Sequence, residues 1–376
     1  MKDKRLYEVS TVLISSIDKK IKENEKNILL CNFIDIYKNW AITQDNRKNF
    51  LSVTATDIEI NKFKLKKGQV AITKDSETRD DIGVPSYIAD DFDDAVLGYH
   101  TALIIPNTKL LDGKYLTAYL NTKTIKNFFE FNATGSGQRY TLSVDVINNI
   151  PLNLPKLEYQ KVLGKFFSII DRKINLNNKI NDNLEKQLVS YYTYYFLQNN
   201  TSTEKISLDK VADLYQPETI SIKQLDDNLD YFVFGANGII GKYHKYNHEN
   251  YQIAIACRGA NCGITLMTLP KSWITGNAMV VKPKEYFPYK EFLYQTLKLK
   301  SPSYLTSGSA QPQITRENLS LYEIDINDKK KLDKFENFAS RIRKNIISNK
   351  LENISLIKLR EFLLPILMNG QATISE

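Results

Sequence analysis

The most informative segment of the chain is Ala133-Thr134-Gly135-Ser136-Gly137-Gln138, because it leads into a long helical pattern and because the chain repeats this arrangement. Ile150-Pro151-Leu152 follows it, and the helical pattern comes next. The second copy starts at Thr306-Ser307-Gly308-Ser309-Ala310-Gln311 and continues through a short strand-like stretch into a second helical pattern. A repeat distance near half the chain is far longer than the roughly 20–50 residues of a solenoid unit. The sequence therefore predicts one globular module and one helix, each used twice.

Length and composition agree with two domains of ordinary size. The chain has 376 residues, of which 42% are hydrophobic, so each half can bury a core of its own. Its three cysteines show no spacing typical of a secreted disulfide framework, which favours a reducing, cytoplasmic location. No run approaches the ~18 apolar residues of a membrane span, so we expect no membrane partner.

The charge permits nucleic-acid binding but does not establish it. Lysine and arginine number 51 against 43 acidic residues, a net charge of +8. Residues 1–153 and 201–327 are nearly balanced, whereas residues 154–200 carry 7 basic against 4 acidic side chains and residues 328–376 carry 10 against 6. The basic excess therefore lies in the helical stretches.

The two helical patterns are each about 40 residues long, or about 60 Å at ~1.5 Å per residue, which is more than one domain core needs. Pro155 suits the first turn of one helix, and Asn327-Asp328 is a plausible cap at the start of the other. Pro365 is expected to break or kink the second helix near its end. Similar short segments at corresponding places in the two helical patterns suggest that the helices form an antiparallel pair within one chain. Packing of each helix on its own domain, or on a second copy of the chain, stays open. The apolar residues expected to pack the helices are Phe166, Ile170, Ile174, Ile180, Leu184, Leu188, Phe335, Phe338, Ile342, Ile346, Ile354 and Ile357.

The order of these parts resembles the specificity (S) subunit of type I restriction-modification systems. The residues that carry the resemblance are Gly135-Ser136-Gly137-Gln138, Ile150-Pro151-Leu152, Leu157-Glu158-Tyr159-Gln160 and Ile170-Asp171-Arg172-Lys173-Ile174. The resemblance implies an α+β protein with a pseudo-twofold internal repeat. Two globular α/β target-recognition domains, residues 1–152 and 201–326, would be joined by two long antiparallel helices, residues 153–200 and 327–376, as a coiled-coil spacer. The second junction, Tyr322 to Asn327, lacks the prolines of the first, which leaves its geometry open.

The resemblance also implies a function. Each domain would read one half of a bipartite double-stranded DNA target, while the helices set the spacing and dock methyltransferase (M) subunits. Restriction and translocase (R) subunits would complete the assembly. The chain itself would be no enzyme and would hold no cofactor, because S-adenosylmethionine, ATP and Mg²⁺ would be bound by the partner subunits.

Candidate DNA contacts are basic, amide and aromatic side chains of the loops. Arginine can pair with guanine, and asparagine or glutamine with adenine, through two hydrogen bonds each. In the first domain the candidates are Arg47, Lys48, Lys74, Arg79, Tyr99 and His100, with Gln138 and Arg139 at its hinge. In the second domain they are Lys242, Tyr243, Lys245, Arg258, Asn261 and Asn277, with Gln311, Gln313 and Arg316 at the hinge.

Three other interpretations are alternatives to DNA reading. The acidic stretches Asp80-Asp81 and Asp90–Asp94 could hold Mg²⁺ in a stand-alone endonuclease, although acidic runs are more often solvated loops. The set His244, His248, Cys257 and Cys262 has the ligand types of a zinc site but unconvincing spacing, so we predict no metal. A coiled-coil scaffold without a DNA role is the third. The sequence contains neither a methyltransferase Asn/Asp-Pro-Pro-aromatic turn nor a phosphate-binding Gly-x-x-x-x-Gly-Lys loop, and we assign no catalytic residue.

Overall fold

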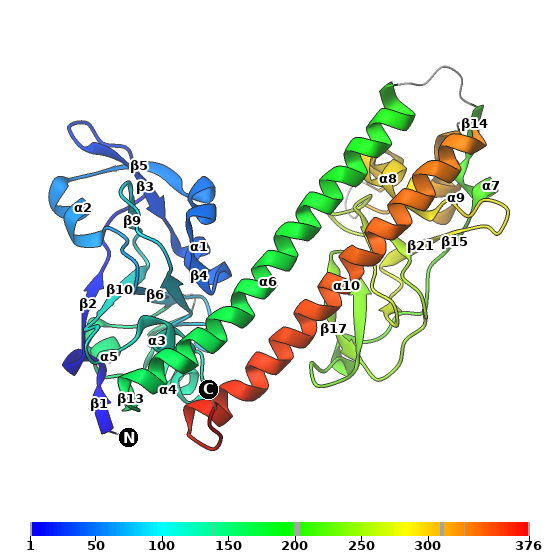
Figure 1. The fold of residues 1–376 in the computed structure, drawn as a ribbon. Coiled ribbons are helices and arrows are strands. Elements are labelled where there is room, and N and C mark those ends of the chain that lie inside the picture. The colour runs from blue at the N-terminus through cyan, green and yellow to red at the C-terminus, as the bar shows by residue number, and fades with distance from the viewer. Residues whose placement is uncertain (1, 138, 199–203, 309–311, 327, 375–376) are drawn as a thin grey trace. The chain divides into compact units, whose positions relative to one another are not determined.

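The computed structural model of the chain describes residues 2–137, 139–198, 204–308, 312–326 and 328–374. The chain divides into two compact units: unit 1 comprises Met1–Leu176 and Glu352–Glu376, and unit 2 comprises Asn177–Leu351. The long helices are α6 (Leu157–Tyr192) and α10 (Lys329–Met368), drawn in green and in orange to red in Figure 1. Each unit therefore combines a globular part with one segment of each long helix.

Unit 1 is built on a five-stranded sheet in the order β2-β10-β6-β8-β4. Its central strand β6 reads Val-Ala-Ile-Thr and is buried at every residue, as expected of a short β-branched run covered on both faces. The strands of this sheet are β2 (Ser10–Ile14), β4 (Ala41–Ile42), β6 (Val70–Thr73), β8 (Pro85–Ile88) and β10 (Thr101–Pro106).

Among the described residues, three smaller sheets and five short α-helices complete the globular part of unit 1. The sheets are β5-β3-β9 (Leu51–Ala55, Lys26–Cys31, Ala95–Leu97), β11-β12-β7 (Thr134–Ser136, Arg139–Thr141, Asp75–Ser76) and β1-β13 (Lys2–Arg5, Pro151–Leu154). The helices besides α6 are α1 (Phe33–Lys38), α2 (Asp57–Phe63), α3 (Gly113–Leu120), α4 (Lys123–Asn132) and α5 (Val144–Asn148). Short 3₁₀ turns occur at η1 (Leu6–Glu8) and η2 (Gln44–Asn49). Asn121 and Thr122 separate α3 from α4.

Unit 2 repeats this plan with fewer strands. Its main sheet is β15-β21-β18-β19 (Ala212–Tyr215, Ala278–Pro283, Ile253–Ala256, Thr265–Met267), flanked by β17-β16-β20 (Gly238–Tyr243, Tyr231–Gly235, Trp273–Ile274) and β14-β22 (Glu204–Ser207, Glu323–Ile326). Its shorter helices are α7 (Leu208–Val211), α8 (Lys290–Leu299) and α9 (Arg316–Ser320), with 3₁₀ turns η4 (Ile222–Gln224) and η5 (Pro302–Leu305). A π-helical turn η3 (Thr193–Gln198) follows α6.

The internal repeat extends to the strand before each long helix. In unit 1, β13 pairs antiparallel with the first strand β1, and in unit 2, β22 pairs antiparallel with β14. Leu6 N–H donates to the Ile150 carbonyl at 3.1 Å, and Leu208 N–H donates to the Tyr322 carbonyl at 2.9 Å. The segment before α10 therefore pairs in the same way as the segment before α6, although it lacks prolines. Strand pairing needs backbone groups and not a particular side chain.

In unit 1, the N-terminal part of α6 packs with the C-terminal part of α10. Phe167 and Ile170 share one hydrophobic core with Leu364 and Leu367. Lys173 and Glu352 form an ion pair at 3.1 Å. Pro365 does not break α10, which continues to Met368.

In unit 2, the C-terminal part of α6 packs with the N-terminal part of α10. The rings of Tyr191 and Phe338 stack with centroids 4.0 Å apart. Asn349 Nδ2 donates to Asn181 Oδ1 at 2.9 Å, and Asn181 Nδ2 donates to the Ile346 carbonyl at 3.4 Å. In both units the pairing joins opposite ends of the two helices. The predicted fold class, with two antiparallel helices in a duplicated α+β chain, is thereby confirmed.

The residues expected to pack the helices fall into three groups. Ile170, Leu188, Phe335, Ile342 and Ile346 are buried. Phe166, Ile174, Leu184 and Phe338 are partly buried against the cores, and Ile354 and Ile357 are half-buried. Ile180 is 39% exposed, and the buried residue that follows it is Asn181. The apolar pattern did not reveal that polar side chains occupy part of the interface.

Candidate DNA interface

In unit 1, three segments far apart in the sequence meet at Lys74, directly after β6. Lys74 N–H donates to the His100 carbonyl at 2.9 Å, and the Lys74 carbonyl accepts from Leu142 N–H at 2.7 Å. His100 precedes β10 and Leu142 follows β12, so the Lys74 backbone joins the main sheet to the β11-β12 hairpin. A hollow of about 470 Å³ lies at this junction, lined by Lys74, Asp75, Tyr99, His100, Arg139 and Thr141 among others.

Asp75 is the centre of the side-chain contacts in this hollow. It accepts from Lys74 Nζ at 3.1 Å and from Arg139 Nη2 at 3.4 Å, and it bonds His100 Nδ1. Arg139 also donates to His100 Nε2 at 2.9 Å. Burial alone would raise the pKa of Asp75, but hydrogen bonds from Thr141, His100 and Lys74 outweigh it and hold the pKa below its ordinary value. Asp75 is thus an ionised acceptor that orients an imidazole and a guanidinium.

The local backbone explains why this motif carries glycine. Gly135 has a φ of 134°, and a Cβ there would lie 2.2 Å from the Arg139 carbonyl oxygen. Only glycine fits such a close approach, which brings the two strands of the hairpin together and places Arg139 at the start of β12. His100 has a φ of 68°, in the left-handed region that few non-glycine residues adopt.

Unit 2 contains the corresponding junction at Cys257, directly after β18. Cys257 N–H donates to the Asn277 carbonyl at 3.2 Å, and the Cys257 carbonyl accepts from Ile314 N–H at 3.0 Å. Bridges pair Gln313 with both Arg258 and Ser307. A hollow of about 390 Å³ lies here, lined by Ala236, Arg258, Gly259, Asn277, Pro312 and Gln313.

The structure places the other predicted DNA contacts away from these two junctions or ties them to protein partners. Arg47 pairs with Asp94 in a bidentate contact, and Arg79 lies over the Tyr140 ring at 5.0 Å. Lys48 is exposed in η2, Lys245 is exposed after β17, and Arg316 is the exposed first residue of α9. Lys242 contacts the Phe232 ring and the Asp227 carbonyl, Tyr243 lies against Trp273, and Asn261 donates to Asn237 at 2.6 Å. Gln138 and Gln311 lie outside the described residues.

Sequence reasoning missed Asp75, the residue that organises the unit 1 junction. It directly follows Lys74 at the end of a buried strand, but nothing in the linear pattern distinguishes it from the other acidic residues. Its importance comes from His100 and Arg139, which are distant in the chain.

The acidic stretches serve local structure. Asp90 accepts from Gln44 N–H at 2.9 Å, Asp91 accepts from Lys67 N–H at 3.0 Å, and Asp93 pairs with Lys64 at 3.1 Å. These carboxylates therefore each bind a different neighbour instead of converging on one point. Among the described residues, no group of three or more His, Cys, Asp or Glu side chains could hold a metal ion.

The cysteines and histidines of the possible zinc site contact separate protein partners. Cys257 Sγ accepts from Gln216 Nε2 at 3.0 Å, and Cys262 Sγ donates to the Pro312 carbonyl at 3.1 Å. His248 bonds the Tyr215 hydroxyl at 3.0 Å, and burial lowers its pKa. His244 is exposed beside the Tyr243 ring.

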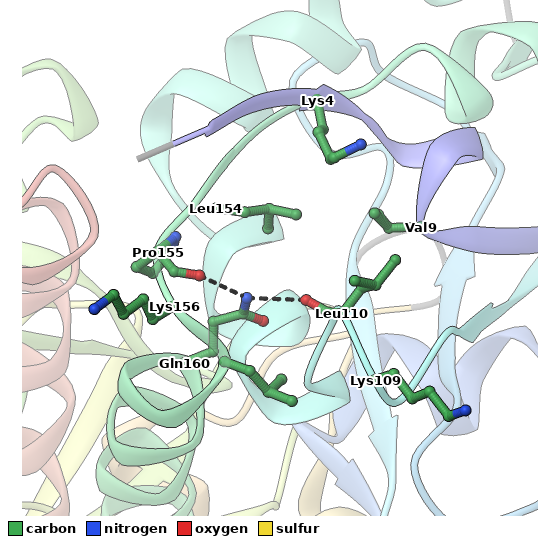
Figure 2. Close-up of a pocket in the computed structure, with 9 residues that line it drawn as sticks. Lys4, Val9, Lys109, Leu110, Leu154, Pro155, Lys156 and Gln160 are labelled. Carbon is green, nitrogen blue, oxygen red and sulfur yellow. Dashed lines mark hydrogen bonds between the residues drawn. The ribbon is translucent and has the colours of Figure 1, made fainter.

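A further hollow of about 450 Å³ lies in unit 1 where α6 begins (Figure 2). Gln160 donates from Nε2 to the carbonyls of Leu110 and Pro155, each at 3.0 Å, and its Oε1 accepts from Asp112 N–H at 3.0 Å. Through these three hydrogen bonds, the buried Gln160 amide connects the start of α6 to the loop before α3.

No helix in the described part of the chain is long and apolar enough to cross a membrane.

Comparisons with known proteins place this architecture in a family. The type I restriction enzyme HindI specificity subunit of Haemophilus influenzae is 26% identical over 134 residues, which are 35% of this chain and 28% of that protein. The match thus spans little more than a quarter of the length of this curated relative. The S subunit of a type I restriction-modification system from M. genitalium superposes with a TM-score of 0.58 at 14% identity, covering 96% of this chain and 94% of that one, and so shares the fold. The HsdS subunit from Thermoanaerobacter tengcongensis gives a TM-score of 0.37 at 14% identity, covering 99% and 97%.

The family description that fits the sequence is "Type I restriction modification DNA specificity domain". It matches residues 2–186 and again residues 200–353, one match for each copy of the internal repeat. Since the two matches cover most of the chain, the protein belongs to the type I restriction modification DNA specificity domain family.

Proposed function

We propose that the chain reads a bipartite duplex DNA target, with each unit reading one half. The observation that carries this proposal is the duplicated junction: Lys74 and Cys257 make the same two backbone hydrogen bonds in the two units. Two similar readers in one polypeptide match a target with two specific halves.

The division of labour within a larger complex is part of the same proposal. The long helices set the separation of the two half-sites and dock methyltransferase subunits, and restriction and translocase subunits join that complex. S-adenosylmethionine, ATP and Mg²⁺ are bound by those partners, which carry out methylation and cleavage. The chain contributes target selection.

An exchange of one globular part tests the proposal. Replacing residues 1–150 by those of a relative with another target should change one half of the selected sequence and leave the other half unaltered. Duplex selection, or mapping of methylated adenines in a host that carries the complete system, reads out both halves. If both halves changed together, or if no bipartite sequence were selected, the proposal would be wrong.

Salt dependence provides a second test. Phosphate contacts made by lysine and arginine release counterions, so binding to the selected duplex should weaken steeply between 50 and 200 mM salt, by roughly tenfold or more. Affinity that does not change with salt and sequence would indicate a scaffold without a DNA role. Cutting of plasmid by the pure chain with Mg²⁺ would instead indicate a nuclease.

A further inference from the structure

We infer that the two junction hollows are the base-reading centres, and that Arg139 in unit 1 and Arg258 in unit 2 each read a guanine in their own half of the target. This inference rests on the proposed function and deepens it, because it assigns one discriminating contact in each half to a named side chain.

The equivalence of the two hollows follows from the backbone. Lys74 and Cys257 occupy the same position, since each follows an inner strand of the main sheet and makes the same pair of hydrogen bonds. The next residue is Asp75 in unit 1 and Arg258 in unit 2. One scaffold position thus carries opposite charges in the two units, as expected if the fold is kept and the target changes.

In unit 1, the arginine is presented in a fixed direction. The Arg139 side chain is 60% exposed, whereas that of Asp75 is 10% exposed. Arg139 reaches Asp75 and His100 through Nη2, so the other N–H groups of the planar fork can donate to a ligand. A guanidinium held at one nitrogen matches the O6 and N7 acceptors of guanine in the major groove. Asp75 and His100 are positioning residues.

In unit 2, the arginine comes from the other strand of the junction. The Arg258 side chain is exposed, and its backbone, which follows β18, pairs with Gln313 through an isolated bridge. Gln313 is held in turn by two backbone hydrogen bonds to Ser307, each 2.9 Å long. The exposed Asn277 lines the same hollow and adds an amide, a group suited to adenine. We therefore expect both a guanine and an adenine in this half.

The experiment selects duplexes from a library with two randomised segments separated by gaps of varied length. The full chain is used, alone and with the methyltransferase subunits of its own system. The decisive variants are Arg139→Lys and Arg258→Lys, which keep the charge but lose the bidentate fork. Each should relax one position of one half by about 5- to 150-fold, the discrimination of one bidentate pair, and leave the other half unchanged.

Asp75→Asn tests the positioning role. It should relax the same base position as Arg139→Lys, and the double variant should lose no more than either single variant. His100→Asn serves as a milder variant, because asparagine tolerates a positive φ. Lys126→Gln, on the exposed surface of α4, is the matched control and should leave every base preference intact. Thermal melting of each variant verifies folding.

The outcomes distinguish a failure of this inference from a failure of the proposed function. If the wild-type chain selects a bipartite sequence but the arginine variants lose affinity equally for all sequences, or lose none, the inference is overturned while the proposed function stands. If the wild-type chain selects no bipartite sequence, the proposed function fails, and the inference fails with it.

Discussion

The buried ion pair between Arg343 and Glu291 attaches the long helix α10 to α8 in unit 2. Arg343 Nε donates to both Glu291 carboxylate oxygens at 3.1 Å, and both side chains are only 1% exposed. Arg343 Nη1 also bonds Glu185, and the guanidinium lies 4.8 Å from the centre of the Tyr294 ring. One arginine therefore neutralises carboxylates from two different helices.

Replacing this arginine should strongly destabilise unit 2. Arg343→Met fills much of the volume but leaves the Glu291 carboxylate buried without its counter-charge, and removing one partner of a buried pair costs roughly 3–5 kcal/mol. Adding Glu291→Gln should recover part of that loss, because it removes the carboxylate that is buried without a counter-charge, while Glu185 keeps its ion pair with Lys298.

The loss should also depend on pH. Burial raises the pKa of Glu291 from 4.5 to about 7, against the opposing effect of Arg343. A carboxyl group with a raised folded-state pKa contributes stability that is present below its unfolded pKa and is lost as the pH rises. Without Arg343 the pKa rises further, so wild type and Arg343→Met lose this stability in parallel up to about pH 7, and the deficit of the variant should grow above that pH.

The assay is denaturant unfolding at several pH values. The chain has two tryptophans, Trp40 in unit 1 and Trp273 in unit 2, so a Trp40→Phe background reports unit 2 alone. The exposed Arg341, two residues away on the same helix, provides the matched control Arg341→Met, expected within about 0.5 kcal/mol of wild type. If Arg343→Met were no less stable than this control, or if its deficit shrank toward pH 8, Arg343 would not be the counter-ion that stabilises buried Glu291.

Three further predictions concern unit 1. In Gly164→Ala, the new Cβ would lie 2.7 Å from a backbone nitrogen of α3, so unit 1 should lose roughly 1–3 kcal/mol of stability, measured by Trp40 fluorescence in a Trp273→Phe background. An unchanged unfolding midpoint would contradict the close packing of α6 and α3. In Gly135→Ala, the clash with the Arg139 carbonyl should disturb the β11-β12 hairpin, abolishing base preference in one half of the target while the other half is kept. Burial raises the pKa of Asp171 from 3.8 to about 6, so its contribution to the free energy of unfolding, up to roughly 3 kcal/mol, is present below pH 4 and lost as the pH rises to 6. Asp171→Asn should remove this dependence of stability on pH. A variant with the same pH profile as wild type would contradict the prediction.

The duplicated architecture was predictable because its signals are local. The Gly-Ser-Gly motif marks a hairpin whose close approach needs glycine at position 135, and the apolar repeat of each long helix indicates a face that must pack. The buried asparagines of that face were not predictable, because an apolar count passes over polar side chains. Asn181 and Asn353 bond the carbonyls of Ile346 and Ile174, corresponding positions of the repeat.

The contacts that organise the candidate site were visible only in three dimensions. Lys74, His100 and Arg139 were each singled out by residue type, but their convergence depends on which strands are neighbours and in which register. The ion pair of Arg47 was likewise not predictable. Its charge made Arg47 a candidate for DNA contact, whereas in the structure it donates to Asp94.

Two similar modules and two long helices are predictable from the amino-acid sequence, because hydrophobic periodicity and turn residues act over a few neighbours along the chain. The fold was needed to show that Asp75 and Arg258 occupy one equivalent position with opposite charge, and that Arg343 is a buried counter-ion. Such properties arise when hydrogen bonds and burial join segments that are distant in sequence, and the identity of a charged residue does not reveal whether it faces solvent or a buried partner.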